Sequence, residues 1–229
     1  EGRAQYYLII SDPANLGRLE ETKSQIAKLA DPRCLGNADE AAEIIAETPA
    51  ITWIGANVHG GEHSTMEAAM CIAYQLAAGE DETTRHILKQ TVVIIDPLQN
   101  PDGRERSVNY FYSAFGLRLN PDPNAAEHRE PWPGGRGNHY LFDLNRDWFP
   151  ITQQDTVGKI QAYLEWHPQV YADLHEMGPD TTYFFFPPAK PINTNLPEQT
   201  IKWWEIYGKA IAEAFDTHGF DYFTAEIFD

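Results

Sequence analysis

The stretch "AITWIGANVHGGEHS", residues 50–64, joins two patterns that together decide the fold. Its first nine residues, 50–58, form an apolar run with β-branched and aromatic side chains, which predicts a buried strand. Ser64 followed by Glu67 predicts a capping box, so we expect a helix to start at Ser64. The polar residues between them then occupy a strand-to-helix turn at the edge of a sheet, where open α/β sheets tend to bind ligands.

The same alternation of apolar runs and helical patterns continues along the chain. Strands are expected at 6–10, 50–58, 91–98, 170–175 and 182–187. Helices are expected at 14–30, 64–78, 83–90, 152–166 and 198–217, with Gly79 ending the second of them. Residues 99–142 are dense in Pro, Gly and Asn and are expected to be a long irregular loop. This order predicts an α/β fold, a sheet with helices on both faces.

Length, charge and cysteine content narrow the class of protein. The 229 residues are of single-domain size, and the net charge of −17 argues against a nucleic-acid partner because it would repel phosphates. No apolar run approaches the roughly 18 residues of a membrane helix. The chain starts at Glu1 without a visible signal peptide, which fits a processed precursor or an excised piece. Cys71 is expected to be buried in the core, and the pairing of Cys34 is open.

His59, Glu62 and His63 offer two alternative pairs of metal ligands. In a turn, His59 and Glu62 can converge on one ion, while Gly60 and Gly61 let the backbone approach closely. The alternative signature, H-x-x-E-H, needs both histidines on one helix face with the Glu as base. That helix would contain two consecutive glycines, each costing about 1 kcal/mol relative to Ala. We therefore favour the turn, although a lone H-x-x-E often arises by chance or simply caps a helix.

A catalytic zinc ion needs a third protein ligand and one position open for water. His175 in "YADLHEMG" ends a predicted strand as His59 does, so both can lie at the same edge of the sheet. The other histidines fall in helices or loops and fit less well. His59, Glu62 and His175 are thus the predicted set. Asp173 shares a strand face with His175, where it can help to order the site; the alternative is that it simply meets water at the sheet edge.

Four segments in register resemble the zinc carboxypeptidase, or metallocarboxypeptidase, family. They are "HGGE" (59–62), "QNPDGRERS" (99–107), "FDLNRDW" (142–148) and "DLH" (173–175). The resemblance implies a mixed, mostly parallel twisted sheet with helices on both faces. It also implies Zn²⁺ as the cofactor, with His59, Glu62 and His175 as its ligands.

The resemblance further implies which residues bind the substrate. Asn145 and Arg146 would hold the free C-terminal carboxylate of a peptide, a task that suits the planar guanidinium fork. The family uses a second Arg to polarise the scissile carbonyl. Of Arg118, Arg129 and Arg136 we favour Arg136, whose alternative role is that of a solvated loop cation. Zinc would lower the pKa of its water to about 7.

The general base of the family, a Glu on a late strand, has no match. Glu176 is expected to point to the sheet face opposite His175, and Glu226 lies closer to His175 than the base would. Two explanations remain open. Either residues 1–229 are a single zinc-peptidase-like catalytic domain that is incomplete at its C-terminus, which we favour, or the protein lacks the base.

The leading hypothesis is a zinc-dependent carboxypeptidase, a hydrolase that cleaves C-terminal peptide bonds with a metal-activated water. One alternative is a deacylase or amidase that acts on N-acyl amino acids with the same zinc and Asn-Arg clamp. Another is an inactive zinc- or carboxylate-binding module. The expected partner is a peptide or acyl-amino-acid substrate with a free carboxylate, without nucleic acid or a membrane span. The expected location is secreted or periplasmic.

Overall fold

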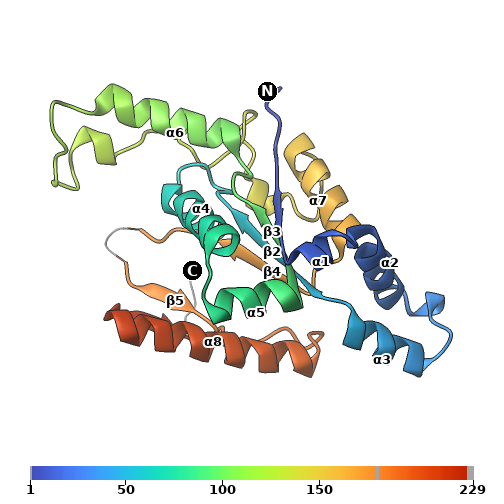
Figure 1. The fold of residues 1–229 in the computed structure, drawn as a ribbon. Coiled ribbons are helices and arrows are strands. Elements are labelled where there is room, and N and C mark those ends of the chain that lie inside the picture. The colour runs from blue at the N-terminus through green and yellow to red at the C-terminus, as the bar shows by residue number, and fades with distance from the viewer. Residues whose placement is uncertain (1, 179–180, 226–229) are drawn as a thin grey trace. The chain divides into compact units, whose positions relative to one another are not determined.

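The computed structural model describes residues 2–178 and 181–225 and divides the chain into two compact units, Glu1–Glu176 and Met177–Asp229 (Figure 1). The first unit holds a four-stranded sheet in the order β1-β3-β2-β4, and the second holds a two-stranded sheet. Among the described residues, no helix combines the length and the apolar character that a membrane crossing requires.

The sheet of the first unit is mixed and mostly parallel, as predicted. Its strands are β1 (Leu8–Ile10), β2 (Ala50–Ala56), β3 (Thr91–Asp96) and β4 (Val170–Leu174). β2 pairs in parallel with both β3 and β4, while β1 pairs antiparallel to β3. Parallel pairing brings the carboxyl ends of β2, β3 and β4 to one edge of the sheet, and this edge carries the residues discussed below.

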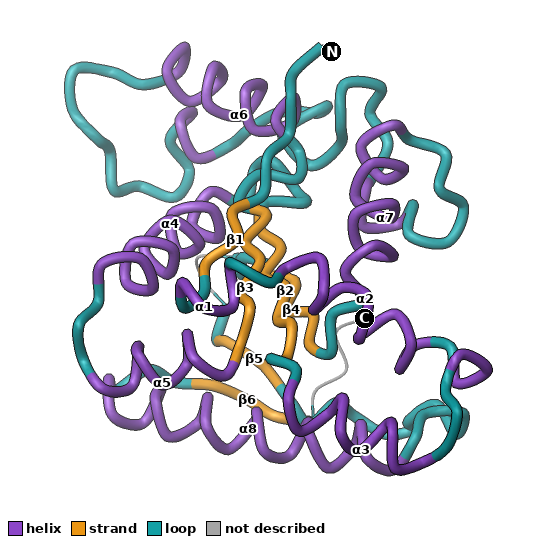
Figure 2. Tube along the Cα trace, turned by 45° about the vertical axis from the view of Figure 1, so that its right-hand side comes forward, coloured by secondary structure: helices purple, strands orange, loops and turns teal. Residues whose placement is uncertain are grey.

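Helices cover both faces of this sheet, which confirms the predicted α/β class. Figures 1 and 2 show α2 (Leu19–Ala30) and α7 (Gln154–Trp166) on one side, with α4 (His63–Ala78) and α5 (Glu82–Gln90) on the other. The first face buries Ile51, Trp53, Val92 and Ile94 against Ile26 and Trp166. The second buries Ala56, Val93 and Ile95 against Ala69, Ala73 and Leu76. Both faces are apolar, so these strands read as continuous hydrophobic runs.

Residues 99–142 are not the irregular loop that their composition predicts, because they contain α6 (Pro101–Ala114). The Asn100 side chain accepts a hydrogen bond from the Gly103 N–H at 2.9 Å, and Pro101 occupies the first helical position. These are helix-start signals that resemble a turn when read alone. The remaining short elements are α1 (Pro13–Leu16), α3 (Ala38–Glu47) and the 3₁₀ turns Pro32–Cys34, Ala126–His128 and Leu144–Arg146.

The start of α4 also differs from the prediction. The helix begins at His63 with Glu62 at the N-cap, and no side chain caps it. The expected capping box is wrong because the Ser64 N–H donates instead to Glu176 Oε2 at 2.7 Å. Gly79 ends the helix as expected.

The two cysteines are both exposed free thiols, so the prediction of a buried Cys71 is wrong. The buried positions of α4 are Thr65, Ala69, Ala73 and Leu76. They recur every three or four residues and form one stripe toward the sheet, and Cys71 lies outside that stripe.

The second unit packs a long helix with two short strands. β5 (Tyr183–Phe185) and β6 (Tyr222–Thr224) pair in parallel, and α8 (Glu198–His218) ends at Gly219 with φ 71°. Aromatic rings connect these elements, with Phe215 of α8 5.0 Å from Tyr183 and 5.2 Å from Phe185 between centroids. β6 was not expected from the sequence, because its three residues show no usable alternation.

Two glycines let the β2–α4 turn and the loop 134–137 pack against the start of α6. A Cβ atom on Gly60 would overlap the backbone atoms of Arg104 and Gly103, and one on Gly103 would overlap the carbonyl oxygen of Gly135. Backbone atoms cannot rotate away as a side chain can. The turn, the helix and the loop are therefore in direct backbone contact.

Gly60→Ala is predicted to destabilise the protein by about 1–3 kcal/mol or more, because the added methyl has no space. The matched control is Gly158→Ala in α7, where a Cβ atom would meet nothing within 4 Å. That change should be neutral or stabilising by about 0.5–1 kcal/mol, since Ala is the better helix former. Thermal unfolding of both variants tests the difference, and equal melting temperatures would contradict the packing described here.

The buried carboxyl group of Asp96 at the end of β3 couples stability to pH. Burial raises the pKa of Asp96 to about 7, although the positive charge of Lys159 opposes the shift. Between about pH 4 and pH 7 the folded protein therefore binds more protons at this site than the unfolded chain does. Its free energy of unfolding should fall as the pH rises through that window.

Asp96→Asn removes this titration. Relative to the variant, the native protein is expected to lose about 1 kcal/mol or more of stability between about pH 4 and pH 7. Unfolding is measured with EDTA present, so that metal binding does not contribute. The exposed Asp39→Asn serves as the control. Parallel pH profiles for the native protein and Asp96→Asn would refute the prediction.

Candidate metal centre

Asn57 shapes the turn that follows β2. It is fully buried, has φ 57°, and its side-chain nitrogen donates to the carbonyl oxygens of His59 at 3.1 Å and Glu62 at 2.9 Å. Asn is among the few residues that adopt left-handed backbone readily. Asn57 was not among the predicted site residues, although an Asn before a Gly-rich turn is a sequence signal for such a role. Its hydrogen bonds fix the turn that presents His59 and Glu62.

The structure brings together the three residues predicted as metal ligands. One ligand atom each from His59, Glu62 and His175 can be chosen so that all lie within 4.8 Å of one another. His59 Nδ1 is 2.6 Å from Glu62 Oε1, and His175 Nδ1 is 3.1 Å from Glu62 Oε2. His59 follows β2 and His175 follows β4, so the parallel pairing of these strands places both rings at one edge.

A second carboxylate holds the outer nitrogen of each imidazole. His59 Nε2 lies 3.1 Å from Asp143 Oδ1, and His175 Nε2 lies 3.1 Å from Asp173 Oδ2. Metal-binding histidines typically donate their second N–H to such a group, which fixes the tautomer and the ring orientation. The contact of Asp173 agrees with its predicted strand face. Asp143 had no assigned role, and its place inside "FDLNRDW" was the only sequence signal.

The donor set fits a zinc ion. Two imidazole nitrogens and one carboxylate oxygen are the ligands of catalytic zinc sites with one open position. A proton joins each Nδ1 to the Glu62 carboxylate in this arrangement, and metal binding to such ligands would displace it. Because both outer nitrogens are held by aspartates, the two Nδ1 atoms are the ones directed at the shared space beside that carboxylate.

His59, Glu62 and His175 form a cluster, and the charged groups in and around this cluster shift the pKa values of its members strongly. Burial alone would raise the pKa of Glu62, but hydrogen bonds with His175, His59 and the Glu176 N–H lower it to about 2. Hydrogen bonds to Asp173 and Glu62 raise the pKa of His175 to about 9, against the effect of its burial. The site therefore stabilises positive charge beside the Glu62 carboxylate, which is what a cation site requires.

His63 takes part in a different set of contacts. Its Nε2 is 2.9 Å from Ser107 Oγ, and Arg104 Nη1 is 3.1 Å from its Nδ1. Burial and the charge of Arg104 lower the pKa of His63, which keeps the imidazole neutral. Because Arg104 can only donate, Nδ1 accepts and the Nε2–H points to Ser107. His63 is the first residue of α4 and anchors that helix to α6.

Of the three candidate arginines, Arg136 is the one that contacts Asp143, the aspartate that holds His59. Its Nε and Nη2 both lie 2.9 Å from Asp143 Oδ2, and Asp143 Oδ1 contacts His59. Arg129 bonds Asn124 in the preceding loop, and Arg118 is exposed there.

Two residues of α6 and its cap hold the loop that carries Arg136. Arg106 donates to the carbonyl oxygens of Gly134 at 2.7 Å, Gly137 at 3.2 Å and Asn138 at 2.9 Å. The Asn100 amide donates to Val58 O and Arg136 O, each at 3.1 Å. The "QNPDGRERS" segment thus joins the β2–α4 turn to the Arg136 loop.

Asn145 and Arg146 lie beside the cluster in a 3₁₀ turn. Asn145 Nδ2 is 3.5 Å from His175 Nε2, a contact and not a hydrogen bond, because that ring N–H points at Asp173. The exposed Arg146 guanidinium donates to the Asn145 carbonyl at 3.2 Å. Arg146 is accessible to a ligand at this position.

Glu176 adjoins the cluster through its backbone. Its N–H donates to Glu62 Oε2 at 3.1 Å, while its carboxylate accepts from the Ser64 N–H at the start of α4. The side chain thus lies toward the helix that covers the face opposite Asp173. The other residue considered as a base, Glu226, lies outside the described residues.

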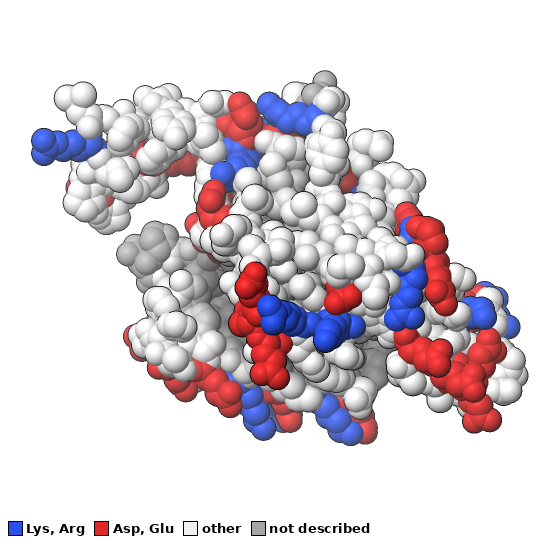
Figure 3. All heavy atoms as spheres, in the orientation of Figure 1, with Lys and Arg blue, Asp and Glu red and all other residues white. Residues whose placement is uncertain are grey.

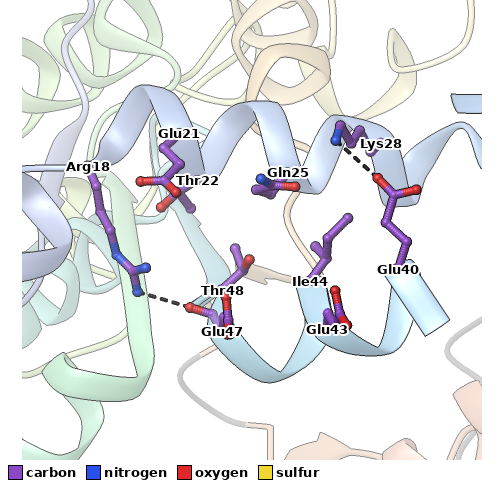
Figure 4. A pocket seen from close by; sticks show the side chains of 10 residues that line it. All are labelled: Arg18, Glu21, Thr22, Gln25, Lys28, Glu40, Glu43, Ile44, Glu47 and Thr48. Carbon is purple, nitrogen blue, oxygen red and sulfur yellow. Dashed lines mark hydrogen bonds and ion pairs between the residues drawn. The ribbon is translucent and has the colours of Figure 1, made fainter. Parts of the chain in front are cut away.

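A separate hollow of about 230 Å³ lies between α2 and α3, and no residue of the cluster lines it (Figure 4). Its lining residues are Arg18, Glu21, Thr22, Gln25, Lys28, Glu40, Glu43, Ile44, Glu47 and Thr48. Figure 3 shows acidic side chains gathered over these two helices, beside basic ones. The hollow belongs to this charged surface and not to the metal centre.

Comparison with known proteins places this geometry in a family. A family profile described as zinc carboxypeptidase matches residues 1–162. A metallo-carboxypeptidase structure from Burkholderia cenocepacia is 18% identical, with a TM-score of 0.54 over 79% of this chain and 42% of that chain. A putative carboxypeptidase A from Shewanella denitrificans is 17% identical, with a TM-score of 0.61 over 100% and 44% of the two chains. Carboxypeptidase A from Helicoverpa armigera is 13% identical, with a TM-score of 0.54 over 97% and 49%.

The chain therefore spans less than half the length of each of these three structures. A comparison with curated protein sequences finds no match. The structural likeness at such low identity concerns the fold, whereas the profile covers well over half of the chain. The resemblance stated from the four motifs is confirmed: the chain belongs to the zinc carboxypeptidase family.

Proposed function

We propose that this chain forms the metal-binding part of a zinc-dependent carboxypeptidase that hydrolyses C-terminal peptide bonds. The convergence of His59, Glu62 and His175 on one point carries the proposal. Family membership supports a hydrolase, and the exposed Arg146 beside the cluster supports a substrate with a free carboxylate. A secreted or periplasmic location stays a prediction.

In this proposal His59, Glu62 and His175 hold the zinc ion. Bound zinc supplies Lewis acidity and activates a water molecule for attack on the scissile carbonyl. Asp143 and Asp173 keep each outer imidazole N–H occupied, so that both Nδ1 atoms stay available to the ion. Glu62 is a ligand in this arrangement and not a base.

The arginines bind and orient the substrate. Arg146, with Asn145, receives the terminal carboxylate through the planar guanidinium fork. Arg136 is assigned to the carbonyl oxygen, where its charge offsets the negative charge that grows during attack. The hydrogen bonds of Arg136 to Asp143 restrict its motion and orient it beforehand.

A second candidate is a module that binds zinc or a carboxylate without hydrolysis. Among the described residues, the three carboxylates that adjoin the cluster already have partners. Asp143 contacts His59 and Arg136, Asp173 contacts His175, and Glu176 accepts from Ser64 N–H. None of them is free to take a proton from water in this arrangement, so the general base is unassigned.

Metal content separates the ligands from their neighbour His63. Removal of any one ligand, by His59→Ala, Glu62→Ala or His175→Ala, is expected to weaken zinc binding more than about 100-fold. Loss of a residue that only hydrogen-bonds a ligand typically weakens metal binding by about 10–100-fold, and loss of a ligand itself should exceed that. His63→Ala should keep about one zinc per chain, because His63 contacts Ser107 and Arg104. Elemental analysis after dialysis measures the stoichiometry. Zinc retained in Glu62→Ala and lost in His63→Ala would favour the H-x-x-E-H alternative.

Arg146→Ala is expected to lower kcat/KM for an N-blocked dipeptide by about 10²–10³-fold, since a charged substrate group loses its partner. Arg118→Ala, in the exposed loop, is the control and should leave kcat/KM unchanged. A dipeptide with an amidated C-terminus should be a poor substrate for the native protein and insensitive to the Arg146 change.

The same assay distinguishes the alternatives. Faster cleavage of N-acyl amino acids than of blocked dipeptides would indicate a deacylase. One equivalent of zinc with no turnover of either substrate would indicate the binding module. Absence of zinc after refolding with the metal would eliminate every hypothesis that requires a zinc ion.

A further inference from the structure

We propose that Lys159 is a positioning residue for the metal centre, holding His175 in its ligand orientation through Gln99 and Asp173. The proposal rests on the proposed function, because it concerns how the zinc ligand is oriented. Lys159 belongs to α7, and no sequence motif connected it with the site.

Three residues form a row across neighbouring strands at the carboxyl edge of the sheet. Gly55 of β2 is in register with Asp96 of β3 on one side and with Asp173 of β4 on the other. A Cβ atom on Gly55 would lie 2.5 Å from Gln99 Nε2 and 2.6 Å from Tyr171 Oη. The missing side chain thus leaves the space that the Gln99 amide occupies between the two aspartates.

Hydrogen bonds run from Lys159 across this space to the cluster. Lys159 Nζ is 3.1 Å from Gln99 Oε1, and Gln99 Nε2 is 3.4 Å from Asp173 Oδ1. The second oxygen of Asp173 is 3.1 Å from His175 Nε2. Lys159 and Gln99 are buried, at 8% and 3% exposure, so water competes little for the hydrogen bond between them.

The donor-only ammonium of Lys159 and the acceptor-only carboxylate of Asp173 together determine the direction of the bonds in this series. An ammonium has only donors, so Gln99 must turn its carbonyl oxygen to Lys159 and its NH₂ group to Asp173. Asp173 then accepts from Gln99 with one oxygen and from the His175 Nε2–H with the other. His175 Nδ1 is left directed at Glu62, as a metal ligand must be.

Lys159 is a buried cation whose charge acts on Asp173 and Asp96. Its Nζ lies 3.8 Å from the centroid of the Trp148 ring and beside a cavity of about 10 Å³ that Asp96 and Gln99 also line. Removing one partner from a buried set of charges is costly, because it leaves the other charges unpaired. A methionine would fill the same space. It would not fix the orientation of Gln99.

His59, the other histidine of the cluster, is held by a similar series of contacts. Arg136 contacts Asp143, which contacts His59. On each side a cation orients a carboxylate, directly for His59 and through an amide for His175. The two arrangements come from unrelated segments of the chain, which supports a common positioning role.

Three variants test the proposal. Lys159→Met removes the charge and keeps the volume. Gln99→Glu leaves Lys159 paired but replaces the donor that faces Asp173 with an acceptor. The matched control is Lys23→Met, because Lys23 also lies over a tryptophan, 4.8 Å from the Trp166 centroid, but bonds Glu165 away from the cluster.

Three quantities are measured for each variant. Zinc affinity is determined by competition with a chelator, and the visible spectrum is recorded for the cobalt-substituted protein. Thermal melting of the apo-protein is followed in EDTA. Lys159→Met and Gln99→Glu are expected to weaken zinc binding about 10–100-fold and to alter the cobalt spectrum. Apo-protein melting reports any loss of folding stability in Lys159→Met, and Lys23→Met should bind zinc as the native protein does.

Zinc affinities of Lys159→Met and Gln99→Glu within twofold of native would overturn the proposal while leaving the proposed function intact. If Lys159→Met fails to fold, Gln99→Glu becomes the deciding variant, because it retains a partner for Lys159. Native zinc affinity in Gln99→Glu would then contradict the proposal by itself. Absence of zinc binding by the native protein would refute the proposed function itself, a distinguishable outcome.

Discussion

Parallel pairing of β2 with β4 is the constraint on which the candidate centre depends. Residues that follow two adjacent parallel strands emerge at the same edge, so His59 after β2 and His175 after β4 meet although 113 residues separate Glu62 from His175. The pairing in turn requires that both faces of the strands be covered. Ile51 and Trp53 pack toward α2 and α7, while Ala56 packs toward α4. The same strands thus form the apolar core along their length and carry the polar residues at their carboxyl ends.

The polar edge is organised by groups that only donate and groups that only accept. Guanidinium and ammonium groups donate, carboxylates accept, and each imidazole lies between a carboxylate and the shared space at Glu62. This alternation leaves few rotational choices for the rings of His59 and His175. It also explains why Asp143 and Asp173 matter as much to the geometry as the three ligand residues do, since they decide which nitrogen each ring presents.

Much of this arrangement is visible in the sequence, and the exceptions have physical reasons. β2 and β3 are continuous apolar runs because both faces are buried, and β4 is a shorter, half-buried run, so the existence and order of all three could be predicted. Asp173 could be placed beside His175 because a strand alternates its faces. The start of α6 could not be predicted, since Asn100 and Pro101 are also common in turns. The role of Lys159 could not be predicted either. Its neighbours Gln99 and Asp173 are 60 and 14 residues away along the chain, and only the packing of α7 brings them near.

The separation between the ligands also has a mechanical consequence. An ion held by residues of the β2–α4 turn and by His175 would act as a cross-link that closes a loop of more than a hundred residues. Closing so long a loop removes much of the freedom of the unfolded chain, and ligand binding to the folded state adds stability by mass action. The ion would therefore fasten β4 to β2 at the open edge of the sheet. Metal removal would then loosen a strand pair and not only vacate a site.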